Sequence, residues 1–440
     1  MTYHSCLSRR RLLQQGVAWT AGVVALPLFV PGGVLGATNR PGANDRIGIG
    51  YIGVGRRGQQ LMGLPKEAQI VAVADVNRPR AEEVAKKRQC RPYQEYRKLL
   101  ECKDIDAVFV ATPDHWHVLA SIHACQAGKD VYCEKPLSLC IREGRRLVEA
   151  VRKYARVLQT GSQRRSMQGH RLGCELVRNG LAGKIHTVRI QNYPSPWECR
   201  FPGQPVPAGL DWDTWCGQTE PVPYHSDIYI SRSKPGWISF RPYSGGEMSG
   251  TGAHGFDQIQ WALDMDHTGP VEVWCEGERL RPLTYTAPES LGRGNQWTSH
   301  GHRVRFRYAN GIEVQLEEGE PAAGAVFIGD EGKIRIGNNT VDSNPVEIAK
   351  HPPSDMKLRV PVSDNHIQNW FDCIKSRGRP IADVEIGHRS AVICHLANIA
   401  RWVGRRLQWD PQRELFVNDE EANGYLERPM RKPFQLPEVL

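Results

Sequence analysis

The 440-residue sequence predicts an α/β protein, with a doubly wound parallel sheet domain followed by an α/β domain that has a large, mostly antiparallel open sheet. In the first part of the chain, short continuous apolar runs alternate with helical patterns, which is typical of a parallel sheet covered on both faces. In the later part, apolar and polar residues alternate within the strands, which indicates an antiparallel sheet with one solvated face.

The first domain is expected at residues 45–162. Its predicted strands are short apolar runs, at residues 46–52, 70–74, 107–113, 130–133 and 157–161. Helical patterns lie between them, at residues 80–88 and 115–128. In a doubly wound sheet, ligands bind outside the carboxyl ends of the strands. We therefore expect the ligand site at that edge of the sheet.

The second domain is expected at residues 163–404, with a C-terminal tail, residues 405–440, that packs on both domains. Its predicted strands alternate polar and apolar residues, at 184–190, 271–275, 303–308 and 312–316. Asn310-Gly311 between the last two runs is a strong signal for a hairpin. Helices at about 365–376 and 388–404 are expected to complete the core of this domain.

A glycine-rich turn, Gly53-x-Gly55-x-x-Gly58, follows the first predicted strand and opens a helix. Gly53 permits the tight turn, Gly55 lets a pyrophosphate approach the backbone, and Gly58 allows close packing of the helix on the strand. The phosphates would lie at the helix N-terminus, where free N–H groups and the helix dipole favour anions. Such a turn alone is weak evidence, but in this strand–turn–helix context it predicts a dinucleotide site.

Asp75 ends the second predicted strand, about twenty residues after the glycines, as such sites require. Its carboxylate is placed to accept hydrogen bonds from the adenosine ribose hydroxyls. Its charge would also repel a 2′-phosphate, so the sequence favours NAD as the cofactor. Arg78 nearby leaves NADP as the alternative.

The N-terminal segment has the pattern of an export signal. Ser8-Arg9-Arg10-Arg11-Leu12-Leu13 precedes an apolar stretch at 17–37, and no acidic residue occurs before Asp45. Paired arginines of this kind are typical of the twin-arginine route. A membrane anchor is the alternative, but prolines and glycines interrupt the apolar stretch. We expect residues 1–37 to be the signal, the protein to be periplasmic or otherwise exported, and no stable membrane span to remain after processing.

Composition argues against two classes of site. The formal net charge of +9 falls to +6 without the three leader arginines, and no basic run with interleaved aromatic residues occurs, so nucleic acid is not an expected partner. Twelve cysteines are present, and their spacing matches neither a zinc site nor a disulfide framework. They are expected to be small buried hydrophobes, and no metal site is predicted.

Several motifs coincide in this chain: Thr112-Pro113-Asp114-His115-Trp116-His117, Glu134-Lys135-Pro136, Gly245-Gly246 and Gly252-Ala253-His254-Gly255-Phe256-Asp257. With the glycine turn, they resemble the Gfo/Idh/MocA oxidoreductase family, which includes glucose–fructose oxidoreductase and inositol dehydrogenase. The resemblance runs from about Arg46 to the C-terminus. The closing stretches are similar to those of a tailed subgroup of exported members, around Asn369-Trp370-Phe371, 385–389 and Trp409-Asp410-Pro411.

The resemblance implies a Rossmann domain followed by a larger α/β domain whose open sheet covers the nicotinamide. Lys135, the lysine of the E-K-P motif, is implied to lie near the reacting carbon, where it orients the substrate and tunes proton transfer. The open sheet often forms the dimer face in this family, so a homodimer or homotetramer is expected. Cofactor contacts are expected from Gly53, Gly55, Arg56, Arg57, Gly58, Asp75, Thr112, Pro113, His117, Glu134, Lys135 and Gln163.

A second group of candidate catalytic residues lies on a predicted helix from His254 to about Leu263. His254 and Asp257 share one face of that helix, and a histidine of near-neutral pKa suits removal of a hydroxyl proton. The family pattern is D-x-x-x-H-x-x-D, but its first aspartate is replaced by Gly250. Asp257, expected to accept a hydrogen bond from a substrate hydroxyl, or Glu247 from the preceding loop could substitute for the missing carboxylate.

Two segments between these motifs have more than one interpretation. Gln163-Arg164-Arg165 follows a predicted strand, and its family position suggests contact with cofactor or substrate, whereas exposed arginines at a domain junction are the alternative. The segment 197–243 is rich in Trp, Tyr and Pro. Aromatic packing between domains, or an oligomer surface, is expected for most of these residues, although aromatic faces also suit sugar rings.

The sequence therefore predicts an exported NAD-dependent oxidoreductase that acts on a sugar, polyol or related hydroxyl compound. Export away from the cytoplasmic nucleotide pool implies a tightly bound cofactor. One alternative is redox-neutral cleavage of a glycoside by transient oxidation at C3, elimination and return of the hydride, which Gly250 and the leader both favour. A second alternative is a cofactor-bound binding protein without turnover.

Overall fold

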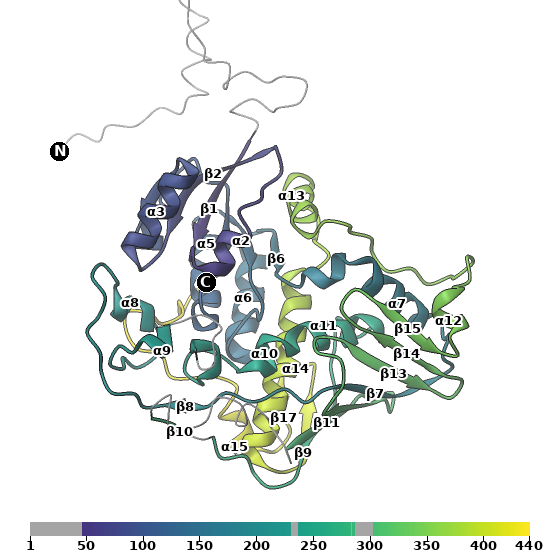
Figure 1. The fold of residues 1–440 in the computed structure, drawn as a ribbon. Coiled ribbons are helices and arrows are strands. Elements are labelled where there is room, and N and C mark those ends of the chain that lie inside the picture. The colour runs from purple at the N-terminus through teal and green to yellow at the C-terminus, as the bar shows by residue number, and fades with distance from the viewer. Residues whose placement is uncertain (1–45, 230–235, 283, 287–301) are drawn as a thin grey trace, which may run out of the picture. The chain divides into compact units, whose positions relative to one another are not determined.

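Six parallel strands form the first sheet, in the spatial order β3-β2-β1-β4-β5-β6 (Figure 1). The computed structural model describes residues 46–229, 236–282, 284–286 and 302–440, so the predicted export signal lies outside the described residues. The strands are β1 (Ile47–Ile52), β2 (Ala68–Ala74), β3 (Arg91–Tyr93), β4 (Ala107–Val110), β5 (Asp130–Cys133) and β6 (Leu158–Thr160). The predicted doubly wound sheet is confirmed.

Strand β3 was not predicted because it has no apolar run: it is three residues long, and Arg91 and Pro92 are exposed at the sheet edge. The central strand β4, in contrast, is buried along its whole length. Helices cover both faces of the sheet, which explains the continuous apolar runs. They are α2 (Arg56–Gln60), α3 (Arg78–Arg88), α4 (Tyr96–Leu100), α5 (His117–Gln126) and α6 (Ile141–Lys153).

The second sheet has nine strands among the described residues, in the order β15-β14-β13-β7-β12-β11-β9-β16-β17. Only β7 and β12 pair in parallel; the other neighbours are antiparallel, as predicted. The strands are β7 (Ile185–Gln191), β9 (Glu272–Glu276), β11 (Arg303–Arg307), β12 (Glu313–Glu317), β13 (Ala325–Gly329), β14 (Lys333–Ile336), β15 (Val341–Asn344), β16 (Leu407–Asp410) and β17 (Leu415–Phe416).

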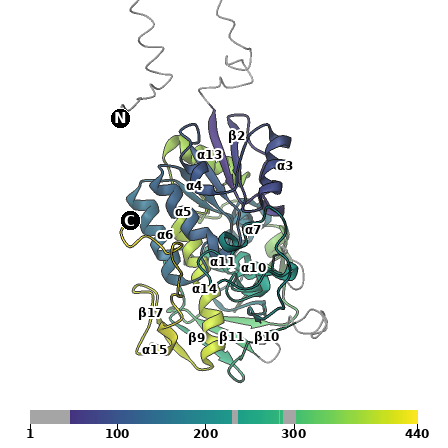
Figure 2. The same cartoon turned by 90° about the vertical axis from the view of Figure 1, so that its left-hand side faces the viewer.

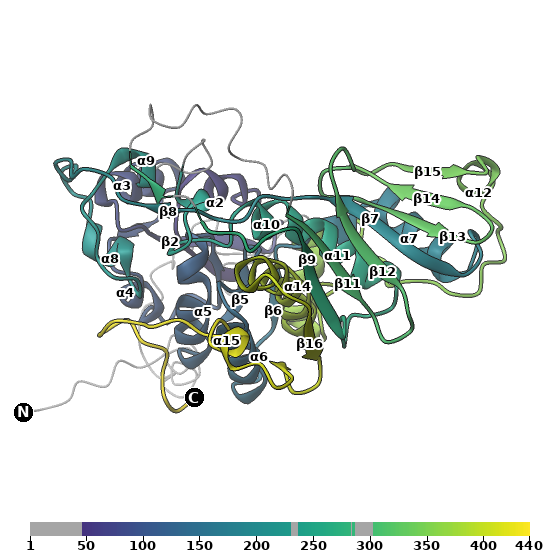
Figure 3. The ribbon, with the colours of Figure 1, turned by 90° about the horizontal axis from the view of Figure 1, so that it is seen from below.

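The predicted hairpin joins β11 and β12, and Gly311 at its tip has a φ of +87°, a conformation that glycine adopts without strain. One face of the sheet packs on α7 (Gln168–Arg178) and α11 (Gly252–Ala262), as seen from below in Figure 3. Strand β14 alternates exposed and buried residues, which is the pattern of a sheet with one solvated face.

The helix α14 (Val384–Val403) connects the cores of the two sheets. Val384 and Ala391 belong to the core of the first sheet, whereas Val392 and Leu396 belong to that of the second. A Cβ atom at Gly387 would lie 2.0 Å from Thr160 Oγ1, so only glycine permits this approach of α14 to β6. The helix therefore fixes the carboxyl edge of the first sheet against the second domain.

The helix α13 (His366–Ser376) corrects one expectation, because it does not complete the core of the second domain. Its residues Trp370 and Phe371 are buried with the first sheet, and the Trp370 ring centroid lies 5.0 Å from that of Phe109. The sequence showed its apolar face but not which sheet that face covers.

The C-terminal tail runs along α5 and α6 (Figure 2). Arg428 pairs with buried Glu143 of α6 at 2.6 Å, and the Phe434 ring packs edge-on at 5.5 Å against Trp116. No helix within the described ranges is both long and apolar enough to cross a bilayer. The eleven cysteines of the described residues are all unpaired, and most are buried.

A half-buried charge network, centred on Arg145, joins α6 to α14 and to the strand pair at the start of the tail. Arg145 donates two hydrogen bonds to Glu385, at 2.7 and 2.9 Å, and two more to Glu414. Burial raises the pKa of Glu385, but the hydrogen bonds from Arg145 outweigh it and lower this pKa to about 2, from an ordinary 4.5. The ionised carboxyl therefore stabilises the fold above pH 4.5, and this contribution is lost as the pH falls towards 2.

We predict that Glu385→Gln lowers the free energy of unfolding at pH 7 by about 2 kcal/mol, because it removes a charge-assisted pair. The difference from wild type should shrink as the pH falls from 4.5 to 2, as followed by urea unfolding at each pH. Glu82→Gln is the control, since Glu82 pairs with Arg78 on the surface and should contribute about 0.5 kcal/mol or less. A Glu385→Gln effect that does not depend on pH would contradict this account.

Candidate active site

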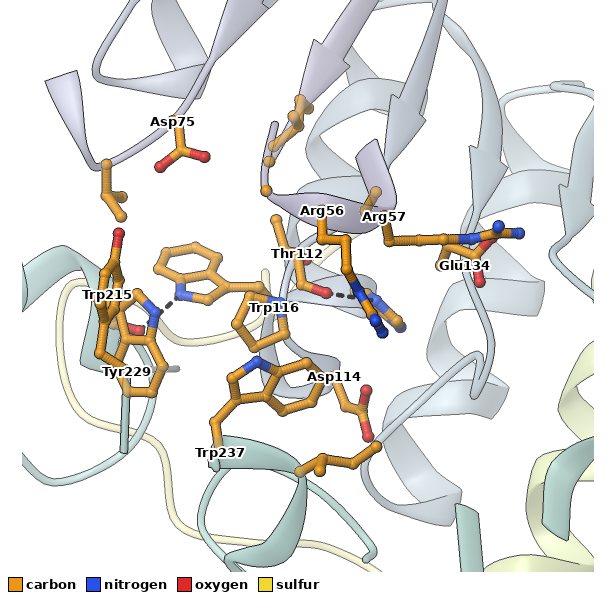
Figure 4. A pocket seen from close by; sticks show the side chains of 18 of the residues that line it. Arg56, Arg57, Asp75, Thr112, Asp114, Trp116, Glu134, Trp215, Tyr229 and Trp237 are labelled. Atoms are coloured by element: carbon orange, nitrogen blue, oxygen red, sulfur yellow. Dashed lines mark hydrogen bonds and ion pairs between the residues drawn. The ribbon is translucent and has the colours of Figure 1, made fainter. Parts of the chain in front are cut away.

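A cavity of about 630 Å³ opens at the carboxyl ends of β1, β2, β4 and β5, where the sequence predicted the ligand site. Its size is that of a small-molecule site. Side chains from the first sheet line one wall, and residues of the segments 214–229 and 237–254 of the following domain line the other. Figure 4 shows Asp75, Trp215 and Tyr229 at one end of this cavity and Asp114 and Glu134 at the other.

The three glycines of the turn have three different surroundings. Gly53 has a φ of +83°, and a Cβ atom there would lie 2.9 Å from the Ala111 carbonyl oxygen. A Cβ at Gly58 would lie 2.2 Å from the Gly53 carbonyl oxygen, so the close helix–strand contact requires glycine. A Cβ at Gly55 would meet only Arg80 Nη1, at 3.8 Å, so the Gly55 backbone faces open space in the cavity.

Asp75 lies at the end of β2 and lines the cavity. Its Oδ2 accepts a hydrogen bond from the Val54 N–H at 3.0 Å, and its Oδ1 accepts one from the Asn77 N–H at 2.9 Å. Arg80 Nη1 lies 3.4 Å from Oδ2, and the Arg80 guanidinium lies over the Tyr229 ring. The carboxylate is thus fixed at the place expected for a ribose contact.

The NADP alternative supposed that Arg78 lies beside Asp75. The basic residue at that place is Arg80. Arg78 pairs with Glu82 on the exposed side of α3 and does not line the cavity. The two arginines differ by two positions on a helix, which places them on different faces.

Two buried polar atoms in the cavity have no hydrogen-bond partner within the described chain: Thr112 Oγ1 and Gln163 Oε1. A bound ligand with hydroxyl or amide groups would satisfy them, as buried polar groups require. Together with the open backbone at Gly55 and the carboxylate of Asp75, they fit a dinucleotide that lies across the strand ends. Pro113 lines the same wall.

His117, Arg57 and Glu134 hold the cavity wall together. His117 Nδ1 lies 2.6 Å from the Pro136 carbonyl oxygen and its Nε2 3.1 Å from that of Thr112, so it joins the ends of β4 and β5. Arg57 Nε donates to Glu134 Oε1 at 2.8 Å. Burial lowers the pKa of Arg57, but the Glu134 charge outweighs it and raises this pKa. Arg56 next to this pair is exposed and faces the cavity (Figure 4).

Lys135 and His254 line the same cavity although they come from different domains. Lys135 lies two residues after the last residue of β5 and next to Glu134. Its Nζ donates a hydrogen bond to the Gly250 carbonyl oxygen at 2.7 Å. His254 lies in the first turn of α11, four residues after Gly250. The structure therefore brings the two predicted proton-handling side chains into one cavity.

Asp257 does not line the cavity, and the structure does not support its assignment as a catalytic residue or as a substrate hydroxyl acceptor. Both carboxylate oxygens accept hydrogen bonds from Arg165 Nε, at 3.0 and 2.9 Å, and Ser390 also donates to Oδ1. Burial raises the pKa of Asp257, and the Arg165 charge opposes this. Asp257 therefore joins α11 to the segment that carries Gln163.

Within Gln163-Arg164-Arg165, only Gln163 lines the cavity. Arg164 donates to the Ala323 carbonyl oxygen at 2.8 Å, and Arg165 is 2 % exposed between Asp257 and Asp266. The alternative of exposed arginines is also wrong for Arg165, which is one of the most deeply buried charges of the protein.

Several cavity residues had no predicted site role, among them Asp114 of the Thr112–His117 motif. It is 3 % exposed, and Ser244 Oγ donates to its Oδ2 at 2.7 Å. The aromatic segment packs as expected, with Trp212 and Trp215 stacked at 4.4 Å. Its inner surface nevertheless lines the cavity, through Trp215, Tyr224, Tyr229, Trp237 and Ile238.

Two family models match consecutive parts of this chain. Residues 47–162 match the oxidoreductase family model of an NAD-binding Rossmann fold, and residues 176–436 match that of a C-terminal alpha/beta domain. The chain belongs to the Gfo/Idh/MocA oxidoreductase family. It is thus an oxidoreductase-family protein whose first domain is of the NAD-binding type, as the glycine turn and Asp75 predicted.

Individual relatives are more distant. Myo-inositol 2-dehydrogenase of Thermotoga maritima is 34% identical over 153 residues, which are 34% of this chain and 46% of that protein. 1,5-Anhydro-D-fructose reductase of Ensifer adhaerens is 22% identical, over 64% of this chain and 74% of its own. The chain thus spans less than half of the Thermotoga enzyme's length at recognisable identity.

Solved structures share the fold. Aldose-aldose oxidoreductase from Caulobacter crescentus, complexed with glycerol, has a TM-score of 0.58 at 16% identity, over 82% of this chain and 99% of that one. The WlbA dehydrogenase from Bordetella pertussis, in complex with NADH and UDP-GlcNAcA, also has a TM-score of 0.58, at 18% identity over 83% and 99%. At sequence identities of 16% and 18%, the structural similarity establishes that the fold is shared.

Proposed function

We propose that this protein is an exported, NAD-retaining oxidoreductase that oxidises or reduces a carbinol carbon of a sugar, polyol or related compound. One observation carries the proposal: Lys135 and His254, from two domains, line the same cavity as the glycine turn and Asp75. The named activities of the relatives, on inositol and on an anhydro sugar, support this substrate class.

The residues divide the cavity into two ends. Asp75 and the open Gly55 backbone would hold the adenosine ribose and the pyrophosphate, and Thr112 and Gln163 would hold polar groups nearer the nicotinamide. NAD, when bound, supplies the hydride acceptor. Lys135, His254, Asp114 and Trp237 form the other end, where the reacting carbon would lie.

The oxidation of an alcohol carbon requires removal of the hydroxyl proton. A neutral imidazole at His254 suits this task as a general base. Lys135 is held by its hydrogen bond to Gly250, so its ammonium group is preorganised beside the place where negative charge develops on the substrate oxygen. Trp237 lines the same cavity near Asp114 (Figure 4) and offers an aromatic surface on which a sugar ring can pack.

The aromatic segment supports a tightly held cofactor. Its backbone is tied to the loop after β2, since Arg78 N–H donates to the Gly209 carbonyl oxygen at 2.9 Å and Asp211 N–H donates to that of Val76 at 3.0 Å. Tyr229 Oη accepts a hydrogen bond from Asn77 Nδ2 at 3.0 Å. The segment therefore covers the adenosine end of the cavity.

The C-terminal tail contacts the aromatic segment and holds it over the adenosine end of the cavity. Arg431 donates to the backbone carbonyl oxygens of Thr219 and Asp213, at 3.0 and 2.7 Å. Trp116 Nε1 donates to the Trp215 carbonyl oxygen at 3.1 Å, and Phe434 packs on Trp116. A nucleotide under this cover would leave only after several contacts had opened, so slow exchange is expected.

A retained cofactor also favours a second candidate function, redox-neutral cleavage of a glycoside, in which the hydride returns to the substrate within each turnover. Such an enzyme needs no external nucleotide, which suits an exported protein. Net oxidation of a free sugar, in contrast, requires a second substrate to reoxidise the cofactor.

A panel of substrates separates these functions. Gel-filtered holoprotein is given nitrophenyl glycosides without added nucleotide, and separately free sugars or inositols with added NAD. Release of nitrophenol without net NADH supports redox-neutral cleavage, whereas steady NADH formation from a free sugar or inositol supports the dehydrogenase. A protein that carries nucleotide yet turns over no member of the panel would contradict the proposal.

Residues 1–37 are part of the same proposal, as a twin-arginine signal that exports the folded holoprotein. We predict that replacing Arg9 and Arg10 by lysine retains the protein in the cytoplasm, because the export receptor reads the paired arginines. Cell fractionation measures this, with Arg40→Lys as the matched control. Undiminished export of the double variant would contradict the assignment.

A further inference from the structure

Glu247 lies at the start of α10 (Glu247–Gly250), which leads through Thr251 into α11. The Thr251 N–H donates to the Glu247 carbonyl oxygen at 3.1 Å, and the His254 N–H donates to that of Thr251 at 3.2 Å. The backbone is therefore nearly helical throughout. Residues 247, 251 and 254 follow one face of it, which leads towards the cavity at His254.

The carboxylate of Glu247 occupies the space that a side chain at position 250 would take. A Cβ atom at Gly250 would lie 3.0 Å from Glu247 Oε2 and 2.9 Å from Ile238 Cδ1. Gly250 itself lines the cavity, and its carbonyl oxygen accepts the hydrogen bond of Lys135. The negative charge thus lies beside the residue that holds Lys135, and one helical turn before His254.

This carboxylate is held in place by its neighbours. Its Oε2 accepts hydrogen bonds from the Thr251 N–H at 3.1 Å and from Thr251 Oγ1 at 2.5 Å. The preceding turn is fixed as well, because Asn398 of α14 donates to the Gly245 carbonyl oxygen at 2.8 Å. Gly246 has a φ of +74°, and a Cβ there would lie 2.6 Å from the Pro196 nitrogen.

We propose that Glu247 is the positioning carboxylate of the reacting end of the cavity. It lies one helical turn before position 250 and supplies the carboxylate that Gly250 lacks. The inference rests on the proposed function. Glu247 forms and breaks no bond. In the oxidation direction, the substrate O–H proton passes to His254, the C–H bond gives its electron pair to the cofactor as hydride, and a C=O bond forms. Glu247 stabilises the positive charge that arises on His254.

The groups around this site come from several elements, and Glu247 is the carboxylate that α10 contributes. Lys135 comes from the end of β5, and Tyr193, whose ring would lie 2.9 Å from a Cβ at Gly252, comes from the segment after β7. Asp114 lines the same cavity from the end of β4. The elements α14 and η3 (Trp237–Ser239) present uncharged residues, Asn398 and Ile238.

The simpler role for Glu247 is an acid at the N-terminus of α11, which would stabilise the helix through its dipole. The two roles differ in what a relocated carboxylate does. Glu247→Ala removes the carboxylate from the space at Gly250, where only the terminal methyl group of the flexible Ile238 side chain must then shift for a Cβ atom. Adding Gly250→Asp returns a carboxylate to nearly the same place. A helix-stabilising role would show in the unfolding temperature, whereas the proposed role shows in kcat.

The test compares E247Q, E247A, the double variant E247A/G250D, and E276Q as a control, since Glu276 is a half-exposed carboxylate paired with Arg305 in the second sheet. Each holoprotein is assayed with whichever panel substrate the wild type turns over. We expect E247Q to lower kcat about 100-fold with KM nearly unchanged and nucleotide still bound. E247A/G250D should recover about tenfold or more of the kcat that E247A loses, while E276Q stays near wild type.

A second readout needs no substrate. The His254 imidazole is titrated by nitrogen-detected NMR, with H254N as the assignment variant, and its pKa should fall by about 1 in E247Q and recover in E247A/G250D. An unmoved His254 titration, or unchanged kcat in E247Q, would overturn the role of Glu247. A shifted titration without turnover of any panel substrate by the wild type would count against the proposed function and leave the Glu247–His254 coupling in place.

Discussion

Replacing Lys135 with methionine is expected to lower kcat by about 10³-fold while the protein keeps its fold and its nucleotide. Methionine has nearly the length of lysine, so the apolar part of the side chain remains. What is lost is the ammonium group, which the Gly250 carbonyl oxygen holds at 2.7 Å beside the reacting end of the cavity. The measurement is turnover of the panel substrate, together with the nucleotide released on denaturation.

Lys98→Met is the control for this variant, since Lys98 pairs with Glu101 on the exposed surface of the same sheet domain. It should leave turnover and unfolding temperature near the wild-type values. Wild-type kcat in Lys135→Met would remove Lys135 from the site. Loss of nucleotide together with turnover would instead assign Lys135 to cofactor binding.

The second large effect is expected from Gly55→Val, which should weaken NAD binding by about 100-fold, or about 3 kcal/mol, without lowering the unfolding temperature of the nucleotide-free protein. The reason is that a side chain at Gly55 meets open space, where a pyrophosphate would lie, and no backbone atom. Calorimetric titration of nucleotide-stripped protein with NAD measures the first quantity, and thermal unfolding measures the second.

Gly58→Val provides the contrast. A Cβ there would lie 2.2 Å from the Gly53 carbonyl oxygen, so this variant should lower the free energy of unfolding by about 3 kcal/mol. Gly63→Val is the control, because nothing lies within 4 Å of its Cβ position. If Gly55→Val destabilised the protein as much as Gly58→Val does, the division of roles within the turn would be wrong.

The first sheet could be predicted from the sequence because its signals are local. The central strands β1, β2, β4 and β5 are largely apolar, and the residue after a strand, such as Asp75 or Glu134, lies at the carboxyl edge by topology alone. The cavity-lining positions of Lys135 and Thr112 follow from the same rule. The hairpin at Gly311 was equally local.

Asp257 could not be predicted because its partner is distant in sequence. The helical spacing from His254 is correct, but the Arg165 guanidinium that occupies both its oxygens comes from 92 residues earlier. Arg80 was missed in favour of Arg78 because the choice depends on where α3 begins and how it is rotated. Both errors concern the direction in which a side chain points. Helical periodicity does not determine that direction when the contact partner of the side chain is unknown.

The replacement for the missing aspartate was left open between Asp257 and Glu247. Only the three-dimensional contacts separate them, since Asp257 is bound to Arg165 whereas Glu247 Oε2 lies 3.0 Å from the Cβ position of Gly250. Likewise, aromatic composition predicted packing for Trp215 and Tyr229, but a residue that packs on one side can line a cavity on the other.

The most direct test of the central claim follows the bound nicotinamide itself. Holoprotein is purified and gel-filtered without added nucleotide, and its absorbance in the band of reduced nicotinamide is recorded before and after addition of each panel substrate. We predict a change in this band, stoichiometric with the chain at most, for at least one sugar, glycoside or inositol, and a change about 10³-fold slower in Lys135→Met. Protein that retains no nucleotide, or whose nicotinamide never changes redox state with any of these compounds, would contradict the account.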